Sequence, residues 1–200
     1  MRPLFLAAIP ALLFTVSCSS LTSMGGGNQY MAGFNKGRQH DWKSSPIPDD
    51  ISYWEGDSVS GPPSVRIRRP LQRAEFYKGS TLVGISRIST GKEGHDTPSG
   101  TYKVDAKIVD YRSSTYGLFR DKTTGQVVNP EADMHKDKVP PGCVYEGAQM
   151  RNFVRFAPGV GMHAGYLPGY AASHGCVRMP EGMSKKFFDA AVVGMPVIVE

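Results

Sequence analysis

Residues 161–165 read Gly-Met-His-Ala-Gly and residues 173–179 read Ser-His-Gly-Cys-Val-Arg-Met, and these two stretches carry the strongest signal in the sequence. They bring two histidines close to one cysteine, with His163 at the end of a predicted strand and His174 two positions before Cys176. A cysteine attacks a carbonyl only as the thiolate, so a neighbouring base has to take the thiol proton. The pattern predicts a cysteine nucleophile at position 176.

The two histidines differ in how freely they can approach the sulfur. A residue on a neighbouring strand can do so without restriction, whereas a residue two positions upstream is held by the short backbone between them, so His163 is the predicted general base. Since no acidic residue lies in this segment, the carbonyl of Ala164 or another nearby acceptor must hold the second ring nitrogen of His163. His174 is then expected to bind substrate or to help position the oxyanion.

The residues around Cys176 also suggest which backbone amides would stabilise the oxyanion formed when a carbonyl is attacked. Gly175 permits backbone torsions closed to other residues, so the loop can turn its amides toward a developing oxyanion. The candidate donors are the amides of Gly175 and Cys176, with that of His174 as a third, and Ser173 is a candidate positioning residue. Arg178 has two interpretations, because it can pair with a substrate carboxylate or pin the loop.

Residues 173–179 resemble the signature of the YkuD-type L,D-transpeptidases, including the hydrophobic residue and the arginine after the cysteine. Residues 89–92 (Ser-Thr-Gly-Lys) and 97–100 (Thr-Pro-Ser-Gly) look like an upstream segment of that family. The resemblance covers about residues 64–200. The interval from His163 to Ser173 is shorter than in the best-known members and matches a shorter-loop branch, which leaves the shape of the substrate cleft open.

The resemblance implies a cysteine-dependent acyltransferase that acts on the tetrapeptide stems of peptidoglycan. Cys176 would form a thioester with the third stem residue, a diamino acid, and release the terminal D-alanine. An amine of a second stem would then give a 3→3 cross-link, whereas water would give a trimmed tripeptide, the L,D-carboxypeptidase reaction. The resemblance further implies that no metal or organic cofactor is needed and that a carbapenem can form an adduct on Cys176.

Other classes of site were weighed against this one. A papain-like cysteine endopeptidase acting on wall peptides would place its cysteine before its histidine, whereas His163 precedes Cys176. A zinc site built from these two residues and His174 lacks CxxC or HxxxH spacing. Cys143 has no activating neighbour and is predicted to be a packed or free thiol, with a disulfide to Cys176 as the alternative in an exported protein. A non-catalytic wall-binding lipoprotein is the remaining class.

Residues 1–17 have the layout of a secretory signal peptide, with a positive start, an apolar stretch and then small residues. Residues 15–18 (Thr-Val-Ser-Cys) resemble a bacterial lipobox, although Thr15 stands where an aliphatic residue is usual. We therefore expect an exported lipoprotein anchored to a lipid membrane through acylated Cys18, facing the periplasm or cell wall. Ser19 resembles a signal for the outer membrane. The alternative is a simple cleaved signal with Cys18 unmodified.

Residues 18–63 follow as a lipidated N-terminus and flexible linker, rich in Gly, Ser, Pro and Asn, and residues 64–200 form the predicted catalytic domain. Within the linker, the aromatic residues Trp42, Tyr53 and Trp54 are expected to pack back onto the domain. The length of the remaining chain fits one domain with one core.

The fold prediction is a mainly β domain, a YkuD-like β-sandwich or barrel with a small helical supplement and one C-terminal helix. The helix is expected to start near Pro180 and to end at Gly194, since its apolar residues fall on one face. The apolar residues in 110–147 follow no regular spacing, which predicts a long excursion that covers a site. Short alternating runs predict strands at 65–68, 74–77, 82–89, 100–107, 149–156, 160–163 and 197–199.

The formal charge of +5 comes from 23 Lys and Arg against 18 Asp and Glu, spread along the chain. This excess allows a weak attraction to anionic wall polymer or lipid, or simply an ordinary solvated surface. Nucleic-acid binding is not expected, because no basic helix or zinc-finger spacing is present. His40, His95 and His135 lie in polar, turn-rich surroundings and are interpreted as surface residues, with His95 and His135 as candidates to line the cleft.

Overall fold

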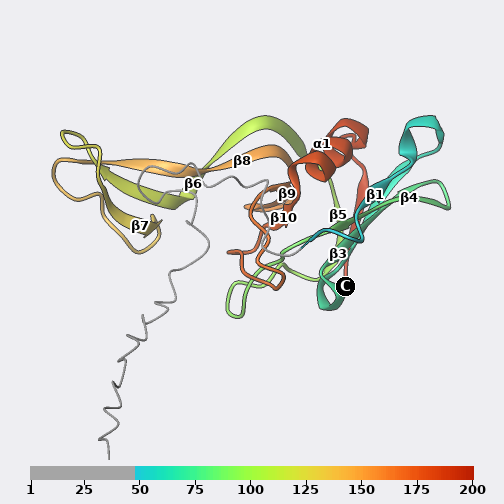
Figure 1. The fold of residues 1–200 in the computed structure, drawn as a ribbon, viewed down its shortest axis with the longest axis horizontal. Helices are drawn as coiled ribbons and strands as arrows, with labels where there is room; N and C mark the ends of the chain where they lie inside the picture. The colour runs from blue at the N-terminus through green and yellow to red at the C-terminus, as the bar shows by residue number, and fades with distance from the viewer. Residues whose placement is uncertain (1–47) are drawn as a thin grey trace, which may run out of the picture.

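The computed structural model describes residues 48–200, which form two mixed β-sheets and, within that range, a single α-helix (Figure 1). The predicted mainly β class with one C-terminal helix is confirmed. No helix among the described residues is long and apolar enough to cross a membrane. The predictions for the signal peptide, Cys18 and Trp42 concern residues outside this range.

The first sheet has six strands in the order β1-β4-β3-β2-β11-β5. Strands β2, β3 and β4 form an antiparallel meander, and the last strand of the chain, β11, joins it parallel to β2. Short 3-10 turns at Gly56–Ser58 and Arg69–Leu71 flank β2. The strands are β1 (Tyr53–Trp54), β2 (Pro63–Arg68), β3 (Arg73–Lys78), β4 (Thr81–Arg87), β5 (Gly100–Lys103) and β11 (Pro196–Val199).

The second sheet has five strands in the order β10-β9-β8-β6-β7. Its central strands pair antiparallel, whereas the short edge strand β10 lies parallel to β9. This parallel pair carries the region singled out from the sequence. The strands are β6 (Ala106–Asp121), β7 (Val127–Asp133), β8 (Cys143–Ala157), β9 (Val160–Ala164) and β10 (Val177–Met179).

Helix α1 (Glu181–Ala190) begins after Pro180, as predicted, but ends four residues before the predicted stop at Gly194. The physical reason is that Ala191 adopts an extended conformation, with φ −71° and ψ 147°, and leads into the approach to β11. Phe187 and Ser184 form its buried face.

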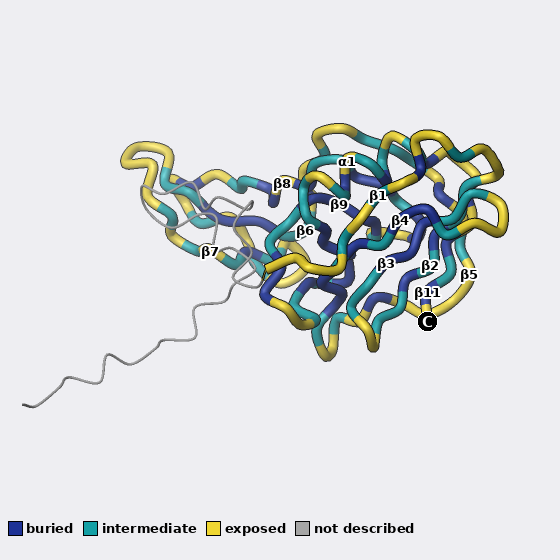
Figure 2. The backbone as a smooth tube through the Cα atoms, turned by 45° about the vertical axis from the view of Figure 1, so that its right-hand side comes forward, coloured by how far each residue is buried: buried dark blue, intermediate teal, exposed yellow. Residues whose placement is uncertain are grey.

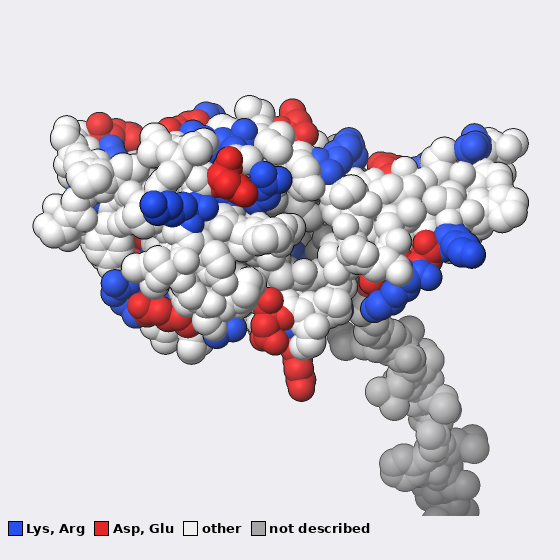
Figure 3. Space-filling view, turned by 180° about the vertical axis from the view of Figure 1, so that it is seen from behind, with Lys and Arg blue, Asp and Glu red and all other residues white. Residues whose placement is uncertain are grey.

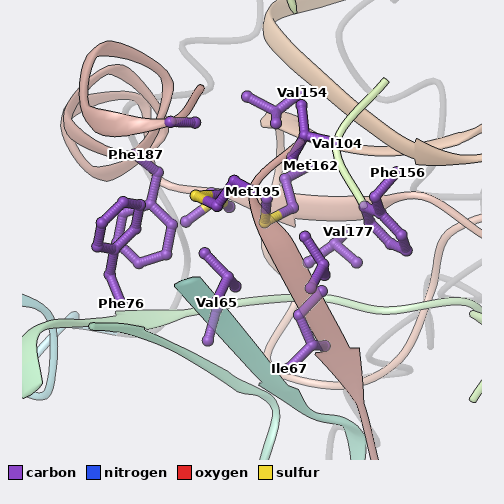
Figure 4. Close-up of a cluster of buried hydrophobic side chains, with 14 of the residues drawn as sticks. Val65, Ile67, Phe76, Val104, Val154, Phe156, Met162, Val177, Phe187 and Met195 are labelled. Carbon is purple, nitrogen blue, oxygen red and sulfur yellow. The ribbon is translucent and has the colours of Figure 1, made fainter. Parts of the chain in front are cut away.

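The main core lies between the first sheet, strands β8 to β10 and helix α1 (Figure 4). Alternation along β2 turns Val65 and Ile67 inward, where they face Met162 of the second sheet. The rings of Phe76 and Phe187 meet edge to face at 5.0 Å, which joins the helix to the first sheet. Burial of each such side chain contributes about 1.5–3 kcal/mol.

The folded domain starts upstream of the predicted boundary at residue 64. Strand β1 pairs with β4, and the ring of Trp54 lies 5.2 Å from that of Phe76. Gly84 makes room for it, because a Cβ at that position would lie 2.7 Å from the indole. The expectation that Trp54 packs back onto the domain is confirmed, and residues 53–63 belong to the domain rather than to the linker.

The prediction of an irregular excursion over residues 110–147 was wrong about its structure. Most of this segment belongs to β6, β7 and β8, which project from the body as an arm whose outer end is largely exposed (Figures 1 and 2). Register shifts in both strand pairings, one of them between Arg112 and Gly117, break the alternation that a strand prediction needs. The arm has its own small cluster of Phe119, Ala132 and Cys143.

We predict that the buried carboxylate of Glu75 in the first sheet stabilises the domain. Glu75 accepts contacts from Arg68 at 3.0 Å, Arg73 at 2.8 Å and Tyr77 at 2.9 Å. Glu75→Gln should lower the free energy of unfolding by about 1–3 kcal/mol in urea denaturation at neutral pH, because it removes charge from a hydrogen-bonded group.

The matched control is Glu146→Gln, since the Glu146–Arg120 pair is about one-third exposed on both sides and should cost less than about 1 kcal/mol. Burial opposes ionisation of Glu75, but its hydrogen bonds from Arg68 and Tyr77 leave its pKa below the ordinary value. The stabilisation should therefore be complete above about pH 5 and be lost on acidification. Equal losses in both variants would contradict this prediction.

Candidate active site

The parallel pairing of β9 and β10 places Cys176 against the neighbouring strand. Val177 lies opposite Met162 and Arg178 opposite His163, so Cys176, which precedes β10, reaches the level of Gly161. Its Sγ donates a hydrogen bond to the carbonyl of Gly159 at 3.6 Å. The residue is 8% exposed, so the sulfur is largely enclosed but not sealed.

Cys176 and His174 both line a cavity of about 260 Å³ between the body and the base of the arm. The arm contributes residues 113–116, where β6 leaves the register of β8. Ser113 shapes this bulge, because its hydroxyl accepts the amides of Thr115 and Tyr116. The predicted excursion therefore does cover the site, although it does so as part of a sheet. The remaining lining residues are Tyr111, His135, Met150, Pro158, Gly159 and Val160.

His163 lies on β9 and is 5% exposed. Its Nδ1 donates to the carbonyl of Ala164 at 2.8 Å, the acceptor named from the sequence. Because a carbonyl can only accept, the hydrogen resides on Nδ1 and the lone pair on Nε2. That Nε2 is buried and has no hydrogen-bond partner within residues 48–200. The lone pair of His163 Nε2 is therefore available to accept a proton.

The electrostatics leave this base uncharged. Burial lowers the pKa of His163 to about 4, the bond to Ala164 opposes that shift, and the positive charge of Arg178 adds to it. Burial also raises the pKa of the Cys176 thiol, against the opposing effects of the Gly161 backbone and Arg178. The resting pair is therefore a neutral imidazole and a neutral thiol.

Phe153 of β8 lies near both His163 and Cys176. Its ring lies 6.3 Å from that of His163 and packs in the same buried cluster as Cys176. Gly161 permits this, since a Cβ there would lie 2.5 Å from the Phe153 ring. Residues 161 and 163 face the same side of β9 because side chains alternate along a strand. Cys176 and His163 therefore lie on the same side of the strand pair.

The loop before Cys176 is held by its own side chains. Ser173 is fully buried, and its hydroxyl donates to the carbonyl of Cys176 and accepts the amide of Gly175 at 3.1 Å. Gly175 has φ +112°, a conformation that residues with a side chain rarely adopt. Since the Gly175 amide already binds Ser173, the Cys176 amide is the member of the predicted pair that is left to receive an oxyanion.

His174 sits between two other rings at the edge of the cavity. It stacks on Tyr116 of the arm at 4.6 Å and meets His95 edge to face at 4.6 Å. Burial, with the nearby charges of Lys92 and His95, lowers its pKa to about 4. His174 therefore faces the cavity as a neutral ring, in a position to contact a substrate.

Arg178 lies away from the cavity and is 2% exposed. Its guanidinium donates to the carbonyls of Ala172 at 3.1 Å and Tyr166 at 3.5 Å, and its stem packs against Gly165. Of the two interpretations made from the sequence, this geometry favours pinning of the 165–172 loop over binding of a substrate carboxylate.

Among the site residues that were not identified from the sequence are Tyr116, which stacks on His174, and Thr97, which bonds to the loop before Cys176. Tyr116 carried no sequence signal, whereas Thr97 lies in the Thr-Pro-Ser-Gly run but had no assigned chemistry. Cys143 and Cys176 are both free thiols, in separate clusters. Across residues 48–200, no three His, Cys, Asp or Glu side chains are grouped so that they could hold a metal ion.

The charged side chains on one face of the molecule are mixed in sign. On the face seen in Figure 3, lysines and arginines alternate with acidic residues over both the body and the arm. That face therefore agrees with an ordinary solvated distribution of charge.

Comparison with known proteins gives a consistent result. The model of the YkuD L,D-transpeptidase catalytic domain matches residues 62–199, whereas no curated protein matches significantly. An L,D-transpeptidase from Mycobacterium smegmatis superposes with a TM-score of 0.52 and 19% identity, covering 69% of this chain and 58% of that one. One from Enterococcus faecium gives 0.50 and 21%, covering 70% and 50%.

A third solved structure, the Ldtfm–avibactam carbamoyl enzyme, gives a TM-score of 0.50 and 22% identity, covering 69% of this chain and 48% of that one. The chain thus spans about half the length of these relatives, and at such identities the likeness concerns the fold. Because the family model covers well over half of the sequence, including the Cys176 loop and the strand that carries His163, this chain belongs to the YkuD family of L,D-transpeptidase catalytic domains.

Proposed function

We propose that this protein is a peptidoglycan L,D-transpeptidase that joins stems through 3→3 cross-links by way of a thioester on Cys176. The observation that carries the proposal is the buried, neutral imidazole of His163, whose Nε2 has no hydrogen-bond partner among the described residues and lies on the strand beside Cys176. Membership of the family and the cavity at the sulfur support the same reaction.

The proposed reaction uses few groups. His163 Nε2 accepts the Cys176 proton as Sγ attacks the carbonyl of the third stem residue, and the Cys176 amide donates a hydrogen bond to the oxyanion that forms. The carbonyl of Ala164 stabilises the resulting imidazolium through Nδ1. His163 then returns the proton to the leaving D-alanine amine, which gives the thioester. An amine of a second stem attacks the thioester, its proton passes to His163, and the thiol is restored.

The proposed reaction can be tested through its products and through variants of Cys176 and His163. The purified chain, mixed with a disaccharide tetrapeptide, should give cross-linked dimer and free D-alanine by mass spectrometry. Cys176→Ala should abolish both, because the acyl carrier is lost. His163→Gln should slow the reaction by about 10²–10⁴-fold, the usual contribution of a general base.

Cys143→Ala is the matched control, because that buried thiol lies in the arm, outside the cavity, and activity should be retained. Tripeptide without dimer would assign an L,D-carboxypeptidase instead, and cleavage elsewhere in the stem a cysteine endopeptidase. Activity that survives Cys176→Ala would refute the mechanism. A carbapenem should add its mass to the wild-type chain and not to Cys176→Ala, in line with the avibactam carbamoyl enzyme of the relative Ldtfm.

Another prediction concerns the charge state of the nucleophile. Because burial raises the thiol pKa and lowers that of His163 to about 4, the resting cysteine should react as a thiol of high pKa. The rate of Cys176 alkylation by iodoacetamide should climb steadily from pH 6 to beyond pH 9, read by mass spectrometry of the Cys176 peptide. A rate that is already maximal near pH 6 would instead reveal a preformed thiolate–imidazolium pair.

We also propose that the protein is an exported lipoprotein, anchored through acylated Cys18 and facing the periplasm or wall. The support comes from the lipobox-like residues 15–18 and the preceding apolar stretch. In cells fed a radiolabelled fatty acid, the wild-type chain should carry label and sediment with membranes, whereas Cys18→Ser should do neither. Ser20→Ala is the control. Equal labelling of Cys18→Ser would exclude this anchor.

A further inference from the structure

We propose that Thr97 is a positioning residue for acyl transfer, which holds the Gly175–Cys176 peptide so that the Cys176 amide points at the oxyanion. The inference rests on the proposed function, since it assumes that Cys176 attacks a carbonyl. Thr97 is far from the nucleophile in sequence, does not line the cavity, and acts only through the backbone that it binds.

The two hydrogen-bond partners of the Thr97 hydroxyl fix the direction in which its proton points. The side chain is fully buried, its Oγ1 accepts the amide of Gly91 at 3.0 Å, and it lies 2.8 Å from the carbonyl oxygen of Gly175. An amide can only donate and a carbonyl can only accept, so the hydroxyl proton must lie on the Gly175 side. Thr97 therefore donates to the Gly175 carbonyl.

The planarity of the peptide bond transmits this contact to the nucleophile. The Gly175 carbonyl and the Cys176 amide belong to one trans peptide group, so they point in opposite directions. Fixing the carbonyl oxygen on Thr97 consequently fixes the amide hydrogen on the far side. This matters at Gly175, because its φ of +112° is open to glycine and the residue has no side chain to hold the peptide in place.

Ser173 supplies the complementary restraint. Its hydroxyl binds the amide of Gly175 on one side and the carbonyl of Cys176 on the other. The peptide group between those two, which carries the Cys176 amide, is the one that Thr97 holds. Two buried hydroxyls thus fix the backbone on either side of the oxyanion donor, which removes the reorganisation that a mobile amide would need in the transition state.

Thr97 is itself held by a tight loop. A Cβ on Gly91 would lie 1.9 Å from the carbonyl oxygen of His95, so residues 91–97 fold closely on themselves. The same loop is joined to the nucleophile loop, because the amide of Lys92 donates to the carbonyl of Ser173 at 2.9 Å. Because this loop is held in place, the Thr97 hydroxyl keeps its position, and rotation of the Gly175–Cys176 peptide would break the hydrogen bond between them.

The test compares two reactions of Cys176 that differ in whether an oxyanion forms. Acetylation by 4-nitrophenyl acetate passes through a tetrahedral oxyanion, whereas alkylation by iodoacetamide displaces iodide and forms none. Both rates are followed by mass spectrometry of the Cys176 peptide in the full chain, with Cys176→Ala as background. Thr97→Val keeps the shape without the hydroxyl, and Thr97→Ser keeps the hydroxyl.

We expect Thr97→Val to slow acetylation about 10- to 100-fold, somewhat less than outright loss of an oxyanion donor, while alkylation changes less than about threefold. Thr97→Ser should restore acetylation. Ser184→Ala is the matched control, because it removes another buried hydroxyl, which bonds to the Glu181 carbonyl and the Asn152 side chain, and should leave the ratio of the two rates unchanged.

A ratio in Thr97→Val within about threefold of wild type, or equal losses in both reactions, would overturn the assignment. If the valine variant does not fold, Thr97→Ala gives the same comparison, since it also lacks the hydroxyl. Neither reagent contains a stem peptide. Absence of cross-linked product from tetrapeptides would therefore refute the proposed function while the rate ratio still decides the role of Thr97.

Discussion

The parallel pairing of β10 with β9 is the constraint on which the site depends. It sets Arg178 opposite His163, and so places Cys176 at the level of Gly161 on the neighbouring strand. Parallel strands need a crossover between them, and here the crossover is the 165–176 loop that carries Cys176. The guanidinium of Arg178 closes that loop from inside by binding its carbonyls. The position of Cys176 and the conformation of the loop before it therefore both depend on β10, the strand that pairs with β9 and carries Arg178.

Burial then decides the chemistry of the pair. In a low-dielectric site both charged forms are disfavoured, so the imidazole stays neutral and the thiol keeps its proton. An ion pair at rest would have to overcome that desolvation, whereas a neutral pair separates charge only as the carbonyl is attacked. The carbonyl of Ala164 fixes the tautomer that makes such a transfer feasible. In the proposed reaction, charge therefore appears only while the carbonyl is attacked.

The surroundings of the nucleophile come from four distant parts of the chain. The 91–97 loop holds the backbone before Cys176, β8 supplies Phe153, β9 supplies His163, and the bulge of the arm lines the cavity. The bulge depends on close approach, since a Cβ on Gly147 would lie 2.0 Å from the carbonyl oxygen of Ser113. The arm therefore lines one side of the cavity through this bulge, although its outer end is remote from the sulfur.

The sequence by itself determined the mainly β class, the start of α1 and most strands of the first sheet, and it named Ala164 as one possible acceptor for His163, because local periodicity and residue chemistry report these features. Only the tertiary structure decided the strands of the arm, whose register shifts erase alternation, and the place of Trp54 in the domain, which depends on Phe76 across the sheet. It also decided the charge states of the pair and the partner of Thr97. These depend on burial and on contacts between segments far apart in the chain, which no local pattern encodes.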